Sequence, residues 1–411
     1  MNIITGGVTA PKGFQAAGIH CGIKDNFTTP QPDKKDLAMI LSSVPCAAAG
    51  TYTRNVVKAD PVILTKEHLA DHQARGIIFD SGNANACAPK GRENAQRMAQ
   101  AAAAATGLRP QDFAVCSTGI IGVELNIQAI EKGVPSLVAA LADTPQASLD
   151  AAHAILTTDL KVKEIAVTVE LGGKTVTIGA IAKGSGMIHP NMGTMLCGIT
   201  TDCAIDGALL QDMLRQVVTK TFNRITVDGD TSTNDTVLLL ANGLAGNAEI
   251  TEKNSDYMAF CQALNYINET LSKKMAGDGE GCTALFEVTV VGAATKDQAK
   301  VLAKSVITSS LTKAAIFGHD ANWGRILCAM GYSGADFDPE KVDLFFESAA
   351  GRMQIIKDGV AVDYSEEEAT KILSEPEVTA IADIKMGDAR ATAWGCDLTY
   401  DYVKINADYR S

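Results

Sequence analysis

Residues 183–196 hold a threonine that could serve as a nucleophile after cleavage of its own peptide bond. Three glycines in this segment disfavour regular structure, whereas residues 195–199 have the apolar character of a buried strand. Thr194 therefore stands where a loop passes into a strand. If its hydroxyl attacked the Gly193 carbonyl and the resulting ester were hydrolysed, Thr194 would become an N-terminus that carries both nucleophile and base. An ordinary tight connection is the alternative interpretation of the same residues.

The sequence lacks the more common arrangements for acyl transfer. None of the six histidines lies in a His-Glu-x-x-His pair, and neither a Gly-x-Ser-x-Gly elbow nor a Cys-x-x-Cys pair occurs. An N-terminal threonine needs none of them. Its α-amino group has a reference pKa of about 7.7 to 8.0 and can take up the hydroxyl proton near neutral pH.

Two further short motifs carry groups that could assist such a nucleophile. Ser117, Thr118 and Gly119 follow an apolar run, so a hydroxyl and a backbone N–H could converge on one point as an oxyanion hole requires. A simple turn is the alternative there. Glu280 stands among three glycines in residues 276–283, which would let the backbone approach a ligand and offer a carboxylate to an ammonium group. A solvated loop is the alternative in that case.

Two other polar segments have less definite interpretations. Residues 228–235 are rich in oxygen ligands, as calcium loops are, but the bidentate glutamate of such loops is missing, so we expect no metal site. Residues 318–325 concentrate polar and aromatic side chains in an expected loop. A packed subunit contact and a pocket wall are equally compatible with that loop.

The composition limits the kinds of molecule that the chain is expected to bind. With 411 residues, 46% of them hydrophobic, the chain is long enough for a large core. A formal net charge of −12 argues against binding to nucleic acids or anionic membranes, which require clustered lysine and arginine. We therefore expect small-molecule substrates.

The cellular compartment is predicted from cysteines and from the N-terminal residues. Ten scattered cysteines lie mostly in apolar or small-residue runs, which is typical of free thiols in a reducing cytosol. The first residues lack the features of a signal peptide, and no stretch approaches the length of a membrane span. These observations predict a cytoplasmic protein.

The apolar pattern predicts mixed α and β layers with much antiparallel pairing. The length predicts two or more packed units, although a domain boundary is hard to place in the sequence. Residues 165–182 predict a hairpin with a Gly172-Gly173 turn that leads directly into the 183–196 segment. Further expectations are strands at 76–80, 113–116, 285–291 and 342–346, helices at 92–106, 208–222, near 252–274 and at 296–311, and an alternating tail at 398–405.

Four motifs, in this order along the chain, resemble the ornithine acetyltransferase family, also called glutamate N-acetyltransferase. Residues 117–122 resemble its oxyanion-hole motif and residues 183–196 its self-processing segment. Residues 278–281 resemble its acidic substrate loop, and residues 406–409 its C-terminus. The resemblance extends along nearly all of the chain.

This resemblance implies a layered α/β sandwich like that of N-terminal-nucleophile enzymes, with mixed, largely antiparallel sheets covered by helices. It implies a precursor that cleaves itself between Gly193 and Thr194 into an α chain, residues 1–193, and a β chain, residues 194–411, which assemble as an α2β2 heterotetramer. The implied activity is transfer of an acetyl group from N2-acetylornithine to L-glutamate in arginine biosynthesis, by a ping-pong mechanism through acetyl-threonine. No cofactor is implied, although bifunctional members also use acetyl-CoA as a donor.

The resemblance also implies roles for individual residues. Thr194 would be the nucleophile, and Thr118 with the N–H of Gly119 would form the oxyanion hole. Lys183 suits a substrate α-carboxylate, and Glu280 suits the side-chain ammonium of ornithine. The implied substrate-binding residues are Thr157, Thr158, Lys183, Thr194, Glu280, Asn406 and Ser411, with the choice between Thr157 and Thr158 left open.

Two rival hypotheses remain at this point. An N-terminal-nucleophile aminopeptidase or amidase would use the same nucleophile but pass the acyl group to water. A binding protein would use the same glycine-rich pocket without any cleavage.

Overall fold

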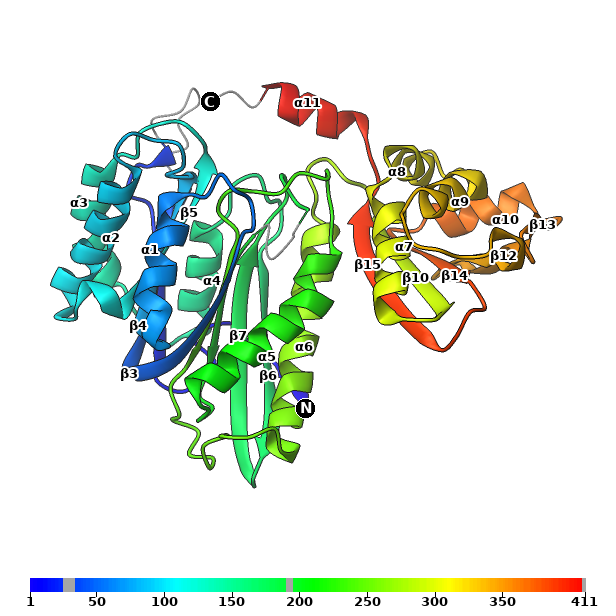
Figure 1. The fold of residues 1–411 in the computed structure, drawn as a ribbon. Coiled ribbons are helices and arrows are strands. Elements are labelled where there is room, and N and C mark those ends of the chain that lie inside the picture. Colours follow the sequence, from blue (N-terminus) through cyan, green and yellow to red (C-terminus); the bar gives the residue numbers. More distant parts are fainter. Residues whose placement is uncertain (25–33, 190–194, 409–411) are drawn as a thin grey trace.

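The computed structural model describes residues 1–24, 34–189 and 195–408. Within them, fifteen strands form two sheets, of nine and six strands (Figure 1). The larger sheet has the order β1-β6-β7-β8-β9-β3-β4-β5, with β2 paired to β3. Its strands are β1 (Asn2–Ile4), β2 (Phe14–Ile19), β3 (Leu37–Tyr52), β4 (Gln73–Asn83), β5 (Phe113–Ile120), β6 (Lys163–Leu171), β7 (Lys174–Lys183), β8 (Leu196–Thr201) and β9 (Thr236–Ala241).

The larger sheet is doubled over on itself at β3. The first part of this strand pairs with β4 and its last six residues pair with β9, with a register shift between Leu41 and Cys46. Ile40 and Phe79, from β3 and β4, consequently share one buried core with Leu196 and Leu238, from β8 and β9. Two layers of strands therefore face each other across an apolar interior.

Helices cover the outer faces of both layers. On β8 and β9, Cys197 and Val237 point away from the inner core and pack with the helices α5 and α6, as the alternation of strand side chains requires. Helices α2 and α3 cover the outer face of the other layer in the same way. The result is an α–β–β–α arrangement whose outer helices are α1 (Asp60–His68), α2 (Gly91–Thr106), α3 (Ile127–Ala139), α5 (Gly207–Lys220) and α6 (Ser255–Ala276). Helix α4 (Pro145–Ala154) instead packs into the inner core.

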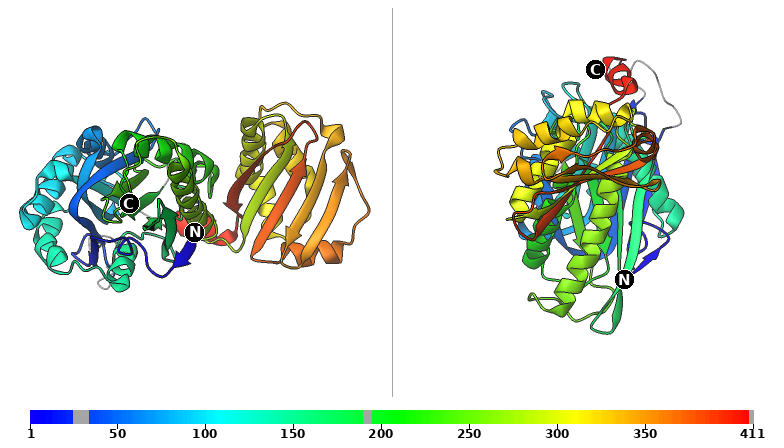
Figure 2. Two further views of the ribbon diagram at one scale, coloured as in Figure 1. Left: turned by 90° about the horizontal axis from the view of Figure 1, so that it is seen from below. Right: turned by 90° about the vertical axis from the view of Figure 1, so that its right-hand side faces the viewer.

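The second sheet forms a separate, smaller lobe beside the first (Figure 2). Its order is β13-β12-β11-β14-β10-β15, and α7 to α10 pack against it around their own core. From this lobe, α11 (Tyr400–Asp408) runs back over the larger one (Figure 1). The remaining elements are β10 (Leu285–Ala293), β11 (Asp343–Ser348), β12 (Gly351–Lys357), β13 (Val360–Ala361), β14 (Glu377–Asp383), β15 (Ala389–Cys396), α7 (Lys296–Thr308), α8 (Ser310–Phe317), α9 (Trp323–Gly331) and α10 (Glu366–Leu373).

The predicted fold class is confirmed: helices cover mixed sheets, in which only β4–β5, β8–β9 and β10–β14 pair in parallel. The hairpin predicted at 165–182 is β6–β7. The single helix predicted at 296–311 is wrong, because Ser309 ends α7 and caps α8. The loop predicted at 318–325 is only partly correct, because the side chain of Asn322 caps α9 within it.

The alternating tail predicted at 398–405 is also wrong as an extended segment. The Thr399 hydroxyl accepts a hydrogen bond from the Tyr402 N–H at 3.2 Å, which is a helix-capping contact. No strand pairs with this segment among the described residues, so α11 forms instead.

The division at residue 193 does not coincide with a boundary between the lobes. Residues 184–195 connect β7 to β8, which are neighbours in the larger sheet, whereas the chain passes between the lobes at residues 277–284. Strands β8 and β9, which follow residue 194, pair with β7 and β3, which precede it. Two fragments cut at this point would share a sheet and two cores.

Two other observations bear on the expected compartment. All ten cysteines are free thiols, of which five are buried. Among the described residues, no helix has the length and apolar character needed to cross a membrane.

Candidate active site

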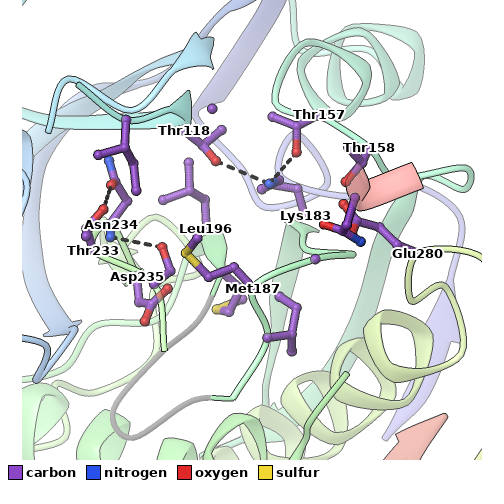
Figure 3. A pocket seen from close by; sticks show the side chains of 17 residues that line it. Thr118, Thr157, Thr158, Lys183, Met187, Leu196, Thr233, Asn234, Asp235 and Glu280 are labelled. Carbon is purple, nitrogen blue, oxygen red and sulfur yellow. Dashed lines mark hydrogen bonds between the residues drawn. The ribbon is translucent and has the colours of Figure 1, made fainter. Parts of the chain in front are cut away.

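One cavity, with a volume of about 150 Å³, gathers the predicted site residues that the structure describes (Figure 3). They come from distant parts of the sequence: the end of β5, the segment between α4 and β6, the end of β7, the segment between the lobes and the last helix. The predicted residues that line the cavity are Thr118, Gly119, Thr157, Thr158, Lys183, Glu280 and Asn406.

Lys183 is the central cation of the cavity. Its ammonium donates hydrogen bonds to the hydroxyls of Thr157, at 2.7 Å, and Thr118, at 3.2 Å (Figure 3). The side chain is only 9% exposed. Burial lowers the pKa of Lys183, and the carboxylate of Asp159, 4.0 Å away, opposes this shift. Because Thr118 accepts from Lys183, the proton of its hydroxyl is left to point toward a third group, such as a substrate oxygen.

Gly119 occupies a position that only glycine fits. Its φ of +136° lies outside the range of ordinary side-chain-bearing residues, and an added Cβ would lie 2.2 Å from the carbonyl carbon of Gly82 on β4. This close contact between parallel strands turns the chain at the end of β5. The turn places Thr118 and Gly119 together at the cavity wall, as an oxyanion hole requires.

A buried ion network lies behind Lys183 and was missed from the sequence. The ammonium of Lys163, fully buried, lies 2.7 Å from Asp159 and 2.6 Å from Asp278. Asp159 also accepts a hydrogen bond from the Gly184 N–H. Burial alone would raise the pKa of Asp159, but Lys183 and Lys163 outweigh it and lower the pKa to about 2.

This network joins three of the segments that line the cavity. Asp159 anchors the residue after Lys183, and Asp278 accepts hydrogen bonds from the N–H groups of Leu160 and Lys161. Asp278 stands two residues before Glu280. Asp278 lies within a motif that the sequence analysis names, and Asp159 directly follows the predicted binding residues Thr157 and Thr158. Their partner Lys163 opens an apolar strand, and nothing in the pattern signals that it is buried.

Glu280 is positioned by contacts from both lobes. Its N–H donates to the Ser185 carbonyl at 3.1 Å, and one carboxylate oxygen accepts from the Asn406 side chain at 2.8 Å. The carboxylate packs against Gly186, where an added Cβ would lie 2.4 Å from it. Asn406 belongs to α11, so the last helix of the smaller lobe completes a cavity in the larger one.

The chain turns sharply just before the segment that the structure leaves undescribed. Met187 has a left-handed φ of 53°, which is uncommon for a long side chain. The carboxylate of Asp228 holds this turn by accepting hydrogen bonds from the N–H groups of Met187, at 2.7 Å, and Ile188, at 2.8 Å. Asp228 therefore positions backbone, which is a role that the sequence did not suggest.

The polar segment 232–235 forms one wall of the cavity. The amide of Asn234 donates to the carbonyls of Ala84, at 2.6 Å, and Ser117, at 2.8 Å, which ties this wall to the residue before Thr118. From the sequence, this segment resembled only a calcium loop without the bidentate glutamate. Its place beside the cavity depends on the pairing of β8 with β9, which the sequence pattern did not reveal.

Three predicted residues, Gly193, Thr194 and Ser411, lie outside the described residues, and so does the predicted cleavage point. The residues next to the first two are described. Met195, which is bonded to Thr194 in the chain, lines the cavity, and Leu196 pairs with Lys183 in the β7–β8 register.

Comparisons with known proteins agree on one family. The family model described as "ArgJ family" matches residues 15–411. The chain is 52% identical to the arginine biosynthesis bifunctional protein ArgJ of Symbiobacterium thermophilum and 46% identical to that of Caldanaerobacter subterraneus, over the full length of all three chains. An ornithine acetyltransferase from Mycobacterium tuberculosis, solved with ornithine, is 40% identical over 45% of this chain and 95% of that chain, with a TM-score of 0.42. The chain therefore belongs to the ArgJ family.

Proposed function

We propose that this protein transfers an acetyl group from N2-acetylornithine to L-glutamate in arginine biosynthesis, and that it also accepts acetyl-CoA as a donor. The relatives that match its whole length are arginine biosynthesis bifunctional proteins. The observation that carries the proposal is the single cavity in which Lys183, Thr118 with Gly119, and Glu280 come together beside Met195.

The first half-reaction takes the acetyl group from the donor. The α-amine of Thr194 accepts the hydroxyl proton while the threonine oxygen attacks the acetyl carbonyl of N2-acetylornithine. The Thr118 hydroxyl and the Gly119 N–H stabilise the negative charge that develops on the carbonyl oxygen. The C–N bond then breaks, the proton passes to the departing amine, and ornithine leaves an acetyl ester on Thr194.

The second half-reaction runs in the opposite direction with glutamate. Its neutral α-amine attacks the ester carbonyl, the C–O bond to Thr194 breaks, and the proton released by the amine returns to the threonine oxygen. When acetyl-CoA is the donor, the C–S bond breaks in the first step and the thiol leaves with the hydroxyl proton. The same acetyl ester forms from both donors.

The cavity suits N2-acetylornithine, which carries a carboxylate and a side-chain ammonium. Lys183 binds the α-carboxylate that acetylornithine and glutamate share, and its contacts with Thr118 and Thr157 place that carboxylate next to the oxyanion hole. Glu280, held by Asn406, binds the side-chain ammonium of ornithine. Thr158 and the terminal Ser411 complete the substrate contacts.

The nucleophile arises by cleavage between Gly193 and Thr194. The α chain, residues 1–193, and the β chain, residues 194–411, stay associated because they share the larger sheet, and two such pairs form an α2β2 heterotetramer in the cytoplasm. The left-handed Met187 turn, fixed by Asp228, supports this step because strained backbone is common where a chain is held for reaction.

An assay of products separates this function from the amidase alternative. Purified enzyme is incubated with N2-acetylornithine, with and without glutamate, and acetate, ornithine and acetylglutamate are quantified. The proposal predicts acetylglutamate and ornithine in equal amounts and little free acetate. Release of acetate at the same rate with and without glutamate would instead identify a hydrolase.

A further inference from the structure

A second cavity, of about 700 Å³, lies between α1 and α5 over the last residues of β3, elements that are labelled in Figure 1. We call it the cationic groove. Four basic side chains line it, and no acidic residue does, although the chain as a whole carries a net charge of −12. The four are Arg54, Lys58, Lys66 and Arg215.

Most of these charges lack a partner within the part of the chain that the structure describes. The ammonium of Lys58 donates to the Asn55 carbonyl, whereas Arg54, Lys66 and Arg215 make no side-chain hydrogen bond or close ion pair with the described residues. Arg215 has only a longer-range attraction to Asp212, whose pKa it helps to lower. Like charges that share a groove repel one another, and a bound anion removes that cost. Unpaired guanidinium and ammonium groups are the usual ligands of phosphate.

Two polar atoms in the lining also lack partners among the described residues. They are the hydroxyl of Thr51, a residue that is only 2% exposed, and Nδ1 of His72. The side chain of Gln211, by contrast, is satisfied by the N–H and the carbonyl of Gly50, at 3.0 Å each. Buried polar atoms in proteins are normally paired, so the groove retains hydrogen-bonding capacity for a ligand.

The cationic groove adjoins the candidate active site. Thr53 donates from its N–H to the Asp235 carbonyl, at 2.9 Å, and from its hydroxyl to the Ser232 carbonyl, at 2.8 Å. The segment that carries Arg54 and Lys58 is thus hydrogen-bonded along the back of the wall of the active-site cavity. Thr53, which lines the cationic groove, therefore lies directly against two residues that line the active-site cavity.

We propose that the cationic groove binds the phosphates of a coenzyme A thioester, whose acetyl group reaches the active-site cavity. This inference rests on the proposed function and adds a site for the second donor. Such a donor has its phosphates at one end and its acyl group at the end of a long flexible arm. It therefore needs a cationic site next to the acyl site, not within it. Helix α1, which forms one side of the groove, has nine residues and is roughly 13 Å long at a rise of about 1.5 Å per residue.

The test uses a double variant of the intact enzyme, Lys66→Gln with Arg215→Gln. Both side chains are exposed, and neither lines the active-site cavity. Lys357→Gln with Arg390→Gln is the matched control, because it removes one exposed lysine and one exposed arginine from the smaller lobe. Initial rates are measured with acetyl-CoA, with S-acetylpantetheine, which has no phosphate, and with N2-acetylornithine, each against glutamate.

We expect the groove variant to raise the KM for acetyl-CoA about tenfold or more. The groove variant should keep the wild-type kcat with acetyl-CoA and the wild-type rates with S-acetylpantetheine and N2-acetylornithine. The control variant should have wild-type kinetics with all three donors. The inference is overturned if the groove variant keeps the wild-type KM for acetyl-CoA, if acetyl-CoA is no donor while acetylornithine is, or if the variant changes the assembly seen by sedimentation. Absence of transfer from acetylornithine would instead contradict the proposed function.

Discussion

The ammonium of Lys183 lies 3.2 Å from the hydroxyl of Thr118, although four strands separate β7 from β5 in the order of the sheet. In a flat sheet these strands would be more than 20 Å apart, at about 4.8 Å for each neighbouring pair. The contact exists because β3 bends and doubles the sheet over, so that the ends of β5 and β7 meet. The active-site cavity is therefore a product of the two-layer fold.

The first prediction concerns the close contact at Gly119. Gly119→Ala would place a Cβ 2.2 Å from the Gly82 carbonyl carbon at a φ of +136°, which forces the end of β5 to move. Because Thr118 and the Gly119 N–H, the proposed oxyanion donors, would move with it, we expect kcat to fall about a hundredfold. Gly331→Ala is the control, since nothing lies within 4 Å of the added carbon there. If Gly119→Ala kept the wild-type kcat, the turn at Gly119 would not be needed for catalysis.

The second prediction concerns the buried ammonium of Lys163. Lys163→Met leaves two buried carboxylates, Asp159 and Asp278, without their shared cation, and we expect a loss of roughly 3 to 5 kcal/mol in the free energy of unfolding. The KM for N2-acetylornithine should also rise, because these aspartates anchor the segments that carry Lys183 and Glu280.

The control for this variant is Lys253→Met. Lys253 pairs with Asp212 at the surface, where both side chains are about half exposed, so its removal should cost less than about 1 kcal/mol. Urea unfolding measures both losses. Equal losses in the two variants would mean that the buried network does not hold the site together.

The third prediction concerns the pH dependence of donor binding. Burial lowers the pKa of Lys183. In the proposed mechanism, its protonated form binds the substrate carboxylate. As the pH rises through this lowered pKa, the charge is lost, so kcat/KM for N2-acetylornithine should begin to fall below the ordinary lysine pKa of about 10.4.

Lys183→Arg keeps its charge at every accessible pH. Even if this variant is slower, the alkaline fall should move to higher pH, toward the titration of the substrate's own ammonium. If kcat/KM of the Lys183→Arg variant falls at the same alkaline pH as that of the wild type, a group other than Lys183 causes the fall.

Much of the fold, but only part of the site, could be predicted from the sequence. The hairpin at 165–182 and the helix at 92–106 followed from local patterns, since glycine turns and alanine runs act over a few residues. The gathering of Thr118, Lys183 and Glu280 was expected only from a family resemblance, because it depends on the bend in β3. Lys163 was missed because its partners are assembled by tertiary contacts.

The cleavage hypothesis is tested most directly by N-terminal sequencing of purified, active protein. The account predicts two polypeptides, one of which begins Thr-Met-Leu-Cys, and a Thr194→Ala variant that remains a single inactive chain of 43.1 kDa. Active protein that consists only of chains beginning at Met1 would contradict it.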